Sequence, residues 1–262
     1  MEKTNYGFIA PYIQPEEWVL GGLIELPEES VILSGQWDAF LPLYEPQAEK
    51  YETYGCTVWG SENATEIYMK GKFGFEPNFD EAFIYNLVGI IPPGANPQDV
   101  YEVIRNYGLI ANNPLPNTYG EFCIPRPPSI EKVNEGKKWL QHYTFKHQWL
   151  FYPTADLQYK QQKIKDCLPM CPIGVSVCAW KQRNNLYYKE IGEQDNHWCV
   201  VFGYVEGEYW KVFDSYDHSV KHLEWDYDFG FAKRIWIGEK KTVETKRSFI
   251  EIIIAFILSW LR

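Results

Sequence analysis

The chain has 262 residues, of which 45% are hydrophobic and 23% charged, which is typical of a folded globular protein with one large domain or two lobes. Its formal net charge is −10, and it has no long cluster of lysine and arginine. Nucleic acid is therefore excluded as an expected partner, because binding to phosphates needs a basic surface.

The cysteine pattern indicates neither a zinc site nor a disulfide framework. The six cysteines are Cys56, Cys123, Cys167, Cys171, Cys178 and Cys199. No two of them have the CxxC spacing of a zinc ribbon, so we expect no metal and no cofactor. One disulfide, within Cys167–Cys171 or from either to Cys123, stays open. The N-terminus has no apolar run of signal-peptide length, which predicts a cytoplasmic or assembly-associated protein with reduced thiols.

The first half of the chain is predicted to be helical. After an N-terminal extension over residues 1–35, a helix is predicted to begin at Cys56, with small and apolar residues following at helical spacing. A second helix is predicted within "NPQDVYEVIRNYGLI" (96–110). There Asn96 suits the N-cap, Pro97 the first helical position and Gly108 the C-terminal stop.

The second half is predicted to be rich in strands. Three prolines in "CIPRPPSI" (123–130) predict an extended connection that crosses between two lobes. A helix over about 155–168 is followed by a strand in "PIGVSVCAW", a hairpin around residues 206–208 and a strand in "FAKRIWIGE". Helices followed by strands predict an α+β fold, with a helical lobe over 36–125 and a β-rich lobe over 126–245.

The C-terminal segment 246–262 is predicted to form an apolar helix. Its apolar run from Phe249 to Leu261 has 13 residues and is interrupted by Glu251. This is shorter than the roughly 20 residues that a membrane-spanning helix needs. A helix that is apolar nearly all round is expected to be buried. Docking of residues 248–262 to a protein assembly, contact with a membrane surface and packing in the chain's own core stay open.

Three residues can be joined into a nucleophilic site. Cys56 lies at a predicted helix N-terminus, where unpaired N–H groups stabilise a thiolate. His197 opens a predicted strand, and Asp214 ends the next strand of the same hairpin, 17 positions later (214 − 197). Pairing of the two strands would bring His197 and Asp214 to one end of the sheet, where a carboxylate can orient an imidazole toward a thiol.

The remaining candidates are interpreted as structural. Cys178 and Cys199 lie in apolar strands and are expected in the core. The other four histidines show no metal-ligand pattern and are expected at the surface; they are His142, His147, His218 and His222.

From about Gln36 to Glu239 the chain resembles the papain-like cysteine peptidases. The segment "GQWDAFLPLYEPQAEKYETYGCTVWGSENATEIYMK" resembles the part of that family that carries the catalytic cysteine and the central helix. "LPMCPIGVSVCAW" is similar to the family's Gly-Pro-Val-Ser-Val strand, and "DNHWCVVFGYVEGEYWKVFDSY" to its histidine strand and the strand ending in Asn-Ser-Trp. The separation of 141 residues between Cys56 and His197 (197 − 56) lies within the roughly 130–150 of the family.

The chain also departs from the family pattern. The family's Cys-Gly-Ser-Cys-Trp is Tyr-Gly-Cys-Thr-Val here. Asp214 takes the place of the family's asparagine, and Tyr216 that of its shielding tryptophan. The family's oxyanion-hole glutamine precedes the nucleophile by six positions, whereas Gln47 precedes Cys56 by nine (56 − 47), which requires a three-residue insertion.

The resemblance implies a two-lobe papain-like fold and hydrolysis of peptide bonds in a peptide or protein substrate. The Cys56 thiolate would attack the carbonyl, His197 would transfer protons, and Asp214 would orient His197. The Cys56 N–H and Gln47 would hold the oxyanion. Two alternatives stay open: a papain-fold protein that no longer cleaves and serves as a structural or docking component, and an amidase or transferase that uses the same triad.

Overall fold

The computed structural model describes residues 6–14, 26–123, 126–217 and 219–240. The predicted C-terminal helix and its expected contacts lie outside these residues. Within the described part of the chain, no helix is both long and apolar enough to cross a membrane.

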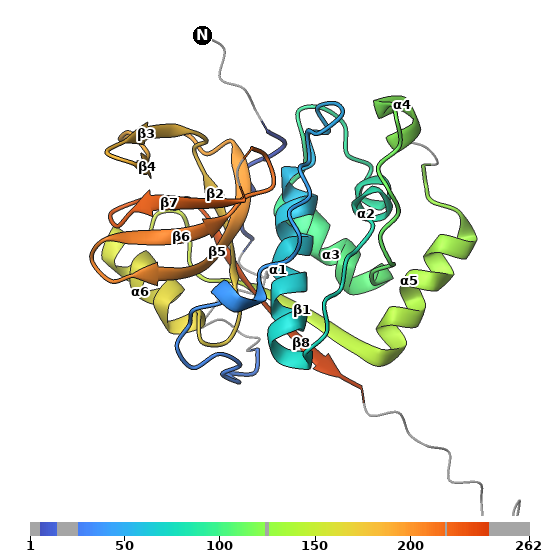
Figure 1. Ribbon diagram of the computed structural model, residues 1–262, viewed down its shortest axis with the longest axis horizontal. Coiled ribbons are helices and arrows are strands. Elements are labelled where there is room, and N and C mark those ends of the chain that lie inside the picture. The colour runs from blue at the N-terminus through green and yellow to red at the C-terminus, as the bar shows by residue number, and fades with distance from the viewer. Residues whose placement is uncertain (1–5, 15–25, 124–125, 218, 241–262) are drawn as a thin grey trace, which may run out of the picture.

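The described residues form a helical half and a sheet half, which confirms the predicted α+β class (Figure 1). The helices are α1 (Cys56–Phe73), α2 (Glu81–Val88), α3 (Pro97–Tyr107), α4 (Tyr119–Phe122), α5 (Ile130–His142) and α6 (Leu157–Cys167), with a short 3₁₀ turn at Asp38–Phe40. Figure 1 shows α1 to α5 grouped on one side of the molecule and α6 beside the sheet.

The eight strands form one sheet in the order β1-β8-β2-β5-β6-β7-β4-β3, in which only β4 and β7 are parallel. The strands are β1 (Tyr143–Trp149), β2 (Ile173–Val177), β3 (Lys181–Arg183), β4 (Leu186–Tyr188), β5 (His197–Val205), β6 (Tyr209–Phe213), β7 (Val220–Glu224) and β8 (Ala232–Glu239). The predicted hairpin is β5–β6: Val200 pairs with Phe213, and Gly207 takes φ 75° in the turn.

Helix α1 is the central helix of the fold. All of its residues from Cys56 to Met69 are buried, as expected of a helix surrounded by other elements. It packs closely on β5, because a Cβ added at Gly60 would lie 2.8 Å from the Trp198 ring and 3.0 Å from the Trp198 carbonyl oxygen. A glycine at this position therefore lets the helix backbone approach the strand that begins with His197.

The predicted limits of α3 are confirmed. The Asn96 side chain accepts a hydrogen bond from the Gln98 N–H at 2.8 Å, and Pro97 is the first helical residue. Gly108 follows the last turn with φ 74°. A Cβ at Gly108 would lie 2.0 Å from the Gly136 carbonyl oxygen, so this glycine also lets α5 pack close to the end of α3.

Two expectations for the middle of the chain are wrong: that residues 123–130 cross directly to the β-rich half, and that His147 lies at the surface. Residues 126–129 lead from α4 into α5, a helix that was not predicted, and the chain enters the sheet only at Tyr143. His147 lies on β1 and is only 2% exposed, because β1 packs against α3. Burial lowers the pKa of His147 to about 3, although Glu102 lies 3.1 Å from its Nε2.

All six cysteines are free, so neither disulfide alternative is formed. Cys178 and Cys199 are buried, as predicted, and Cys167 and Cys171 are also buried.

The close approach of α1 to β5 can be tested with Gly60→Val. The added side chain would overlap Trp198, and overpacking of this kind costs about 1–3 kcal/mol of stability. We expect a lower midpoint of urea unfolding with an unchanged slope. Gly120→Ala is the control, because its Cβ would have no neighbour closer than 3.9 Å. Equal midpoints for the two variants would contradict the role given to Gly60.

Candidate active site

Cys56 is the first residue of α1, and its side chain has no exposed surface. Gly55 precedes it as the N-cap, where a Cβ would lie 2.5 Å from the Trp59 ring. The backbone N–H groups of Trp198 and Thr57 both donate toward the Cys56 sulfur. The sulfur therefore lies against β5, at the residue that follows His197.

The Cys56 thiol is protonated in this conformation. Burial raises its pKa well above the ordinary value of a thiol, and the negative charges of Asp214 and Glu52 add to that rise. The two backbone N–H groups act in the opposite direction but do not outweigh the loss of water. The expected low thiol pKa is thus absent here, because desolvation exceeds the effect of the helix N-terminus.

His197 and Asp214 meet as the hairpin predicted. His197 Nε2 lies 2.5 Å from Asp214 Oδ1, and neither side chain is exposed. The Asp214 carboxylate also accepts a hydrogen bond from the Tyr216 N–H at 3.3 Å. No described residue forms a hydrogen bond with His197 Nδ1. This second ring nitrogen is therefore available to exchange a proton with another group.

Three aromatic rings surround the His197 imidazole edge-on. The ring centroids of Tyr6, Trp180 and Tyr216 lie 5.4, 5.7 and 6.1 Å from that of His197. Sequence reasoning expected a shield only at Tyr216. Trp180 could have been found from strand pairing, because Val177, three residues before it, pairs with His197. The rings keep water from the bond between His197 and Asp214.

A buried lysine completes the environment of Asp214. Lys221 Nζ donates to Asp214 Oδ2 at 2.6 Å, and it also forms an ion pair with Asp217. Burial by itself would raise the pKa of Asp214, but His197 and Lys221 lower it to about 2. Sequence reasoning did not identify Lys221, because an isolated lysine on a strand carries no recognisable pattern.

Gln47 lies beside the nucleophile although the alignment required an insertion. Its backbone N–H donates to the Ser215 carbonyl at 2.8 Å, and its side-chain oxygen accepts from the Ser215 hydroxyl at 3.1 Å. Its Nε2 donates to the Tyr6 carbonyl oxygen at 3.1 Å. The Cys56 N–H donates to the same oxygen at 3.4 Å. The two groups expected to hold an oxyanion therefore converge on one carbonyl oxygen.

Tyr6 is the first of residues 6–9, which are called the N-terminal segment below. In Figure 1 these residues, in dark blue, run between α1 and the sheet. The Tyr6 N–H donates to the Asn196 carbonyl at 3.1 Å. On the helical side, the Ala95 N–H donates to the Gly7 carbonyl, and the Ile9 N–H donates to the Ala95 carbonyl, both at 2.9 Å. Sequence reasoning did not foresee this placement.

Two side-chain features fit the N-terminal segment to the site. Phe8 is 2% exposed, and its ring lies 6.0 Å from those of Trp198 and Phe231. Gly7 takes φ 115°, and a Cβ there would lie 2.1 Å from the Tyr54 carbonyl oxygen. Only glycine can therefore occupy this position without a shift of the backbone.

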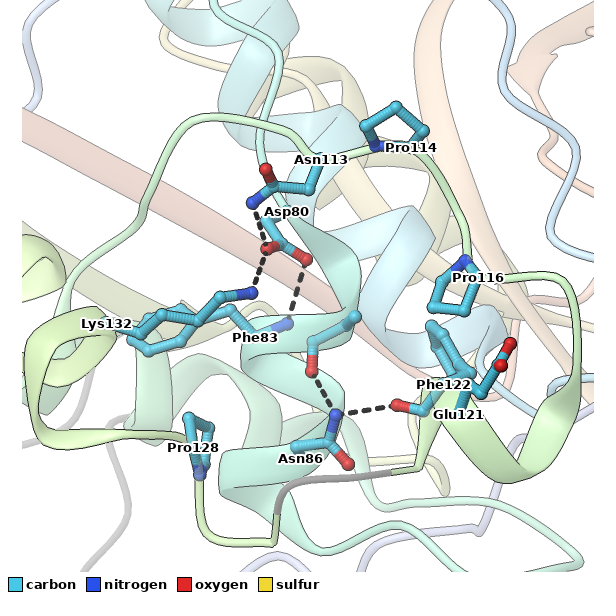
Figure 2. Close-up of a pocket in the computed structure, with 11 residues that line it drawn as sticks. Asp80, Phe83, Asn86, Asn113, Pro114, Pro116, Glu121, Phe122, Pro128 and Lys132 are labelled. Carbon is cyan, nitrogen blue, oxygen red and sulfur yellow. Dashed lines mark hydrogen bonds and ion pairs between the residues drawn. The ribbon is translucent and has the colours of Figure 1, made fainter.

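A separate hollow of about 90 Å³ lies in the helical half (Figure 2). There the Asp80 carboxylate accepts from Asn113 at 2.9 Å, from Lys132 at 2.8 Å and from the Phe83 N–H at 3.2 Å. Asn86 donates to two backbone carbonyls. These polar groups bind one another and join α2 to the start of α5, so we assign the hollow a structural role. Elsewhere in the described residues, no cluster of histidine, cysteine and acidic side chains could hold a metal ion.

Comparison with known proteins supports the fold through structure alone. No protein-family model and no curated protein matches the sequence. Xylellain, a cysteine protease from Xylella fastidiosa, is similar with a TM-score of 0.58 and 18% identity over 91% of this chain and 96% of its own. Digestive procathepsin L 3 of the Tenebrio molitor larval midgut is similar with a TM-score of 0.58 and 14% identity over 89% and 76%. Digestive procathepsin L2 of the same larvae gives 0.54 and 16% over 88% and 78%. The chain therefore has the papain-like cysteine protease fold.

Proposed function

We propose that this protein is a thiol peptidase that cleaves peptide bonds through an acyl-enzyme on Cys56, and that its N-terminal segment occupies the active site in the conformation described. The observation that carries the proposal is the convergence of the Cys56 N–H and Gln47 Nε2 on the Tyr6 carbonyl oxygen. Two donors aimed at one carbonyl oxygen, beside a thiol and an imidazole, are what acyl transfer requires.

The reaction begins when the Cys56 thiol gives its proton to His197 Nδ1 and the thiolate attacks the carbonyl carbon of a peptide bond. The carbonyl oxygen becomes an oxyanion that accepts hydrogen bonds from the Cys56 N–H and Gln47 Nε2. His197 then protonates the leaving amine, the C–N bond breaks and a thioester remains. Water, deprotonated by His197, hydrolyses the thioester. Asp214 holds the imidazole through Nε2 in every step.

The Tyr6 carbonyl stands where the substrate carbonyl would stand in this mechanism. Cys56 and His197 have no exposed surface while the N-terminal segment is in place, and the thiol is neutral. A substrate must therefore displace this segment before it can react. Displacement would also admit water to the thiol and reduce the desolvation that raises its pKa, so binding and activation of the nucleophile are coupled.

The peptidase proposal can be tested with Cys56→Ala and His197→Ala. We expect hydrolysis of a peptide library by the wild type, complete loss in Cys56→Ala, and a reduction of kcat/KM by about 10²–10⁴-fold in His197→Ala, because general acid–base catalysis is removed. Cys123→Ala is the control, since this half-buried cysteine lies outside the site and should keep full activity. Rates for the wild type that equal those of Cys56→Ala would refute the peptidase.

The occupancy of the site can be tested with Phe8→Asp. Removing a buried phenylalanine forfeits about 1.5–3 kcal/mol, so the population of the displaced segment should rise by roughly tenfold to a hundredfold. We expect the rate of Cys56 alkylation by iodoacetamide to rise by the same factor, and a synthetic peptide of residues 4–13 to reverse the effect. Tyr12→Ala is the control, because Tyr12 is 78% exposed. Equal rates in the two variants would show that the segment does not protect the thiol, whether or not peptides are cleaved.

A further inference from the structure

Lys221 is a fully buried cation on the far side of Asp214 from His197. We propose that it is a positioning residue for the Cys56–His197 reaction, which fixes the Asp214 carboxylate toward His197 and cancels its charge at the Cys56 sulfur. This inference rests on the proposed function, because it concerns the thiolate that forms there.

The geometry fixes the carboxylate at both oxygens. Asp214 Oδ1 lies 2.5 Å from His197 Nε2, and Oδ2 lies 2.6 Å from Lys221 Nζ. Rotation about the Cβ–Cγ bond moves both oxygens together, so a cation that holds Oδ2 also holds Oδ1 on the imidazole. The residue is placed by strand pairing, since Lys221 on β7 lies opposite Val212 on β6, two residues before Asp214.

The lysine is itself held from several directions. Its Nζ forms a second ion pair with Asp217 and lies 4.8 Å from the centre of the Trp180 ring and 5.6 Å from that of Tyr187. Trp180 also packs on His197, so one ring contacts both the cation and the imidazole. Lys221 is therefore part of the same packed group as His197 rather than a separate surface ion pair.

Stability alone gives a poor account of this arrangement. Taking a lysine and an aspartate out of water costs several kcal/mol per ion, and apolar residues of similar volume are often equally or more stable in such positions. Both side chains of the Lys221–Asp214 pair have no exposed surface. The position of the pair, in line with His197, gives these charges a role that an apolar pair would lack.

The charges around the reacting atoms explain why Asp214 needs a partner. Desolvation disfavours the Cys56 thiolate most, and the negative charges of Asp214 and Glu52 disfavour it further. Among the described residues, the titratable groups around Cys56 and His197 include Tyr6, Glu52, Cys199, Asp214, Tyr216, Asp217 and Lys221. Lys221 carries the positive charge among these seven residues, and with Asp214 it forms a pair of zero net charge.

A double-mutant cycle separates this role from a merely structural one. Lys221→Met leaves the Asp214 charge uncompensated, so the pH at which Cys56 alkylation by iodoacetamide is half-maximal should rise by about one unit. Asp214→Asn removes the carboxylate that holds both His197 and Lys221 and leaves the Lys221 charge, with its partner Asp217, beside the imidazole, and we expect kcat/KM to fall by roughly 10–100-fold. The double variant has neither charge. Its kcat/KM should be at least tenfold higher than that of Asp214→Asn, and its pH of half-maximal alkylation should equal that of the wild type.

Lys160→Met is the matched control. Lys160 is also buried, with 4% of its side chain exposed, and its Nζ lies 2.8 Å from Asp228 Oδ1, in an ion pair outside the site. The Lys160→Met substitution should lower the unfolding midpoint without moving the pH profile of alkylation. If Lys221→Met changes stability but not the profile, or if the double variant loses the product of the two single losses, the positioning role is wrong. A shifted profile in a protein that cleaves no peptide would overturn the peptidase but keep Lys221 in its role.

Discussion

The candidate site depends on the close packing of the first turns of α1 against the first residues of β5. Gly60 removes the side chain that would keep the two apart, and the Trp198 N–H points at the Cys56 sulfur. The helix supplies the Cys56 thiol and the N–H that donates to the Tyr6 carbonyl oxygen, and the strand supplies the His197 imidazole. Because the two elements meet directly, a helix and a strand bring the thiol and the imidazole together, whereas Tyr6, Gln47 and Asp214 reach the site from segments outside helices and strands.

The same packing explains why the Cys56 thiol is neutral in this conformation. A thiol buried between a helix and a sheet loses water on all sides, and the loss raises its pKa more than two backbone N–H groups lower it. The usual argument that a helix N-terminus activates a cysteine presupposes access of solvent or of a charged partner. Here the N-terminal segment contributes to the burial of Cys56. The same loss of water therefore shields the thiol from reagents and keeps it protonated.

The sequence predicted those parts of the site that local pairing determines. The hairpin brought His197 and Asp214 to one end of the sheet because β5 and β6 are joined by a short turn at Gly207, although an irregularity between Val201 and Gly203 shifts their register by one residue. The resemblance placed Gln47 despite its irregular spacing. Lys221 and Tyr6 could not be predicted in the same way. Tyr6 reaches the site through contacts between segments far apart in the sequence. Lys221 is placed by the pairing of β6 with β7, but no sequence pattern marks this lysine as different from its neighbours.

The elements that were missed have similar reasons. Ser129 caps α5 by accepting from the Lys132 N–H, but the prolines before it predicted only extended chain. His147 was expected at the surface because it belongs to no metal-ligand pattern. In the fold, β1 packs against α3, and the Glu102 carboxylate of α3 lies 3.1 Å from His147 Nε2, so the ring is buried beside an acidic group that the sequence did not place there.

The strength with which the N-terminal segment is held decides how the site could open. The hydrogen bonds described above join residues 6–9 to the site, and each contributes about 0.5–1.5 kcal/mol net. Burial of the Phe8 side chain adds about 1.5–3 kcal/mol. Ordering four residues costs about 1–2 kcal/mol each, which is of similar size. The gain and the cost are therefore of similar size. Because a peptide that makes the same backbone contacts would compete for the same donors, we expect such a peptide to be able to open the site without cleavage of the chain.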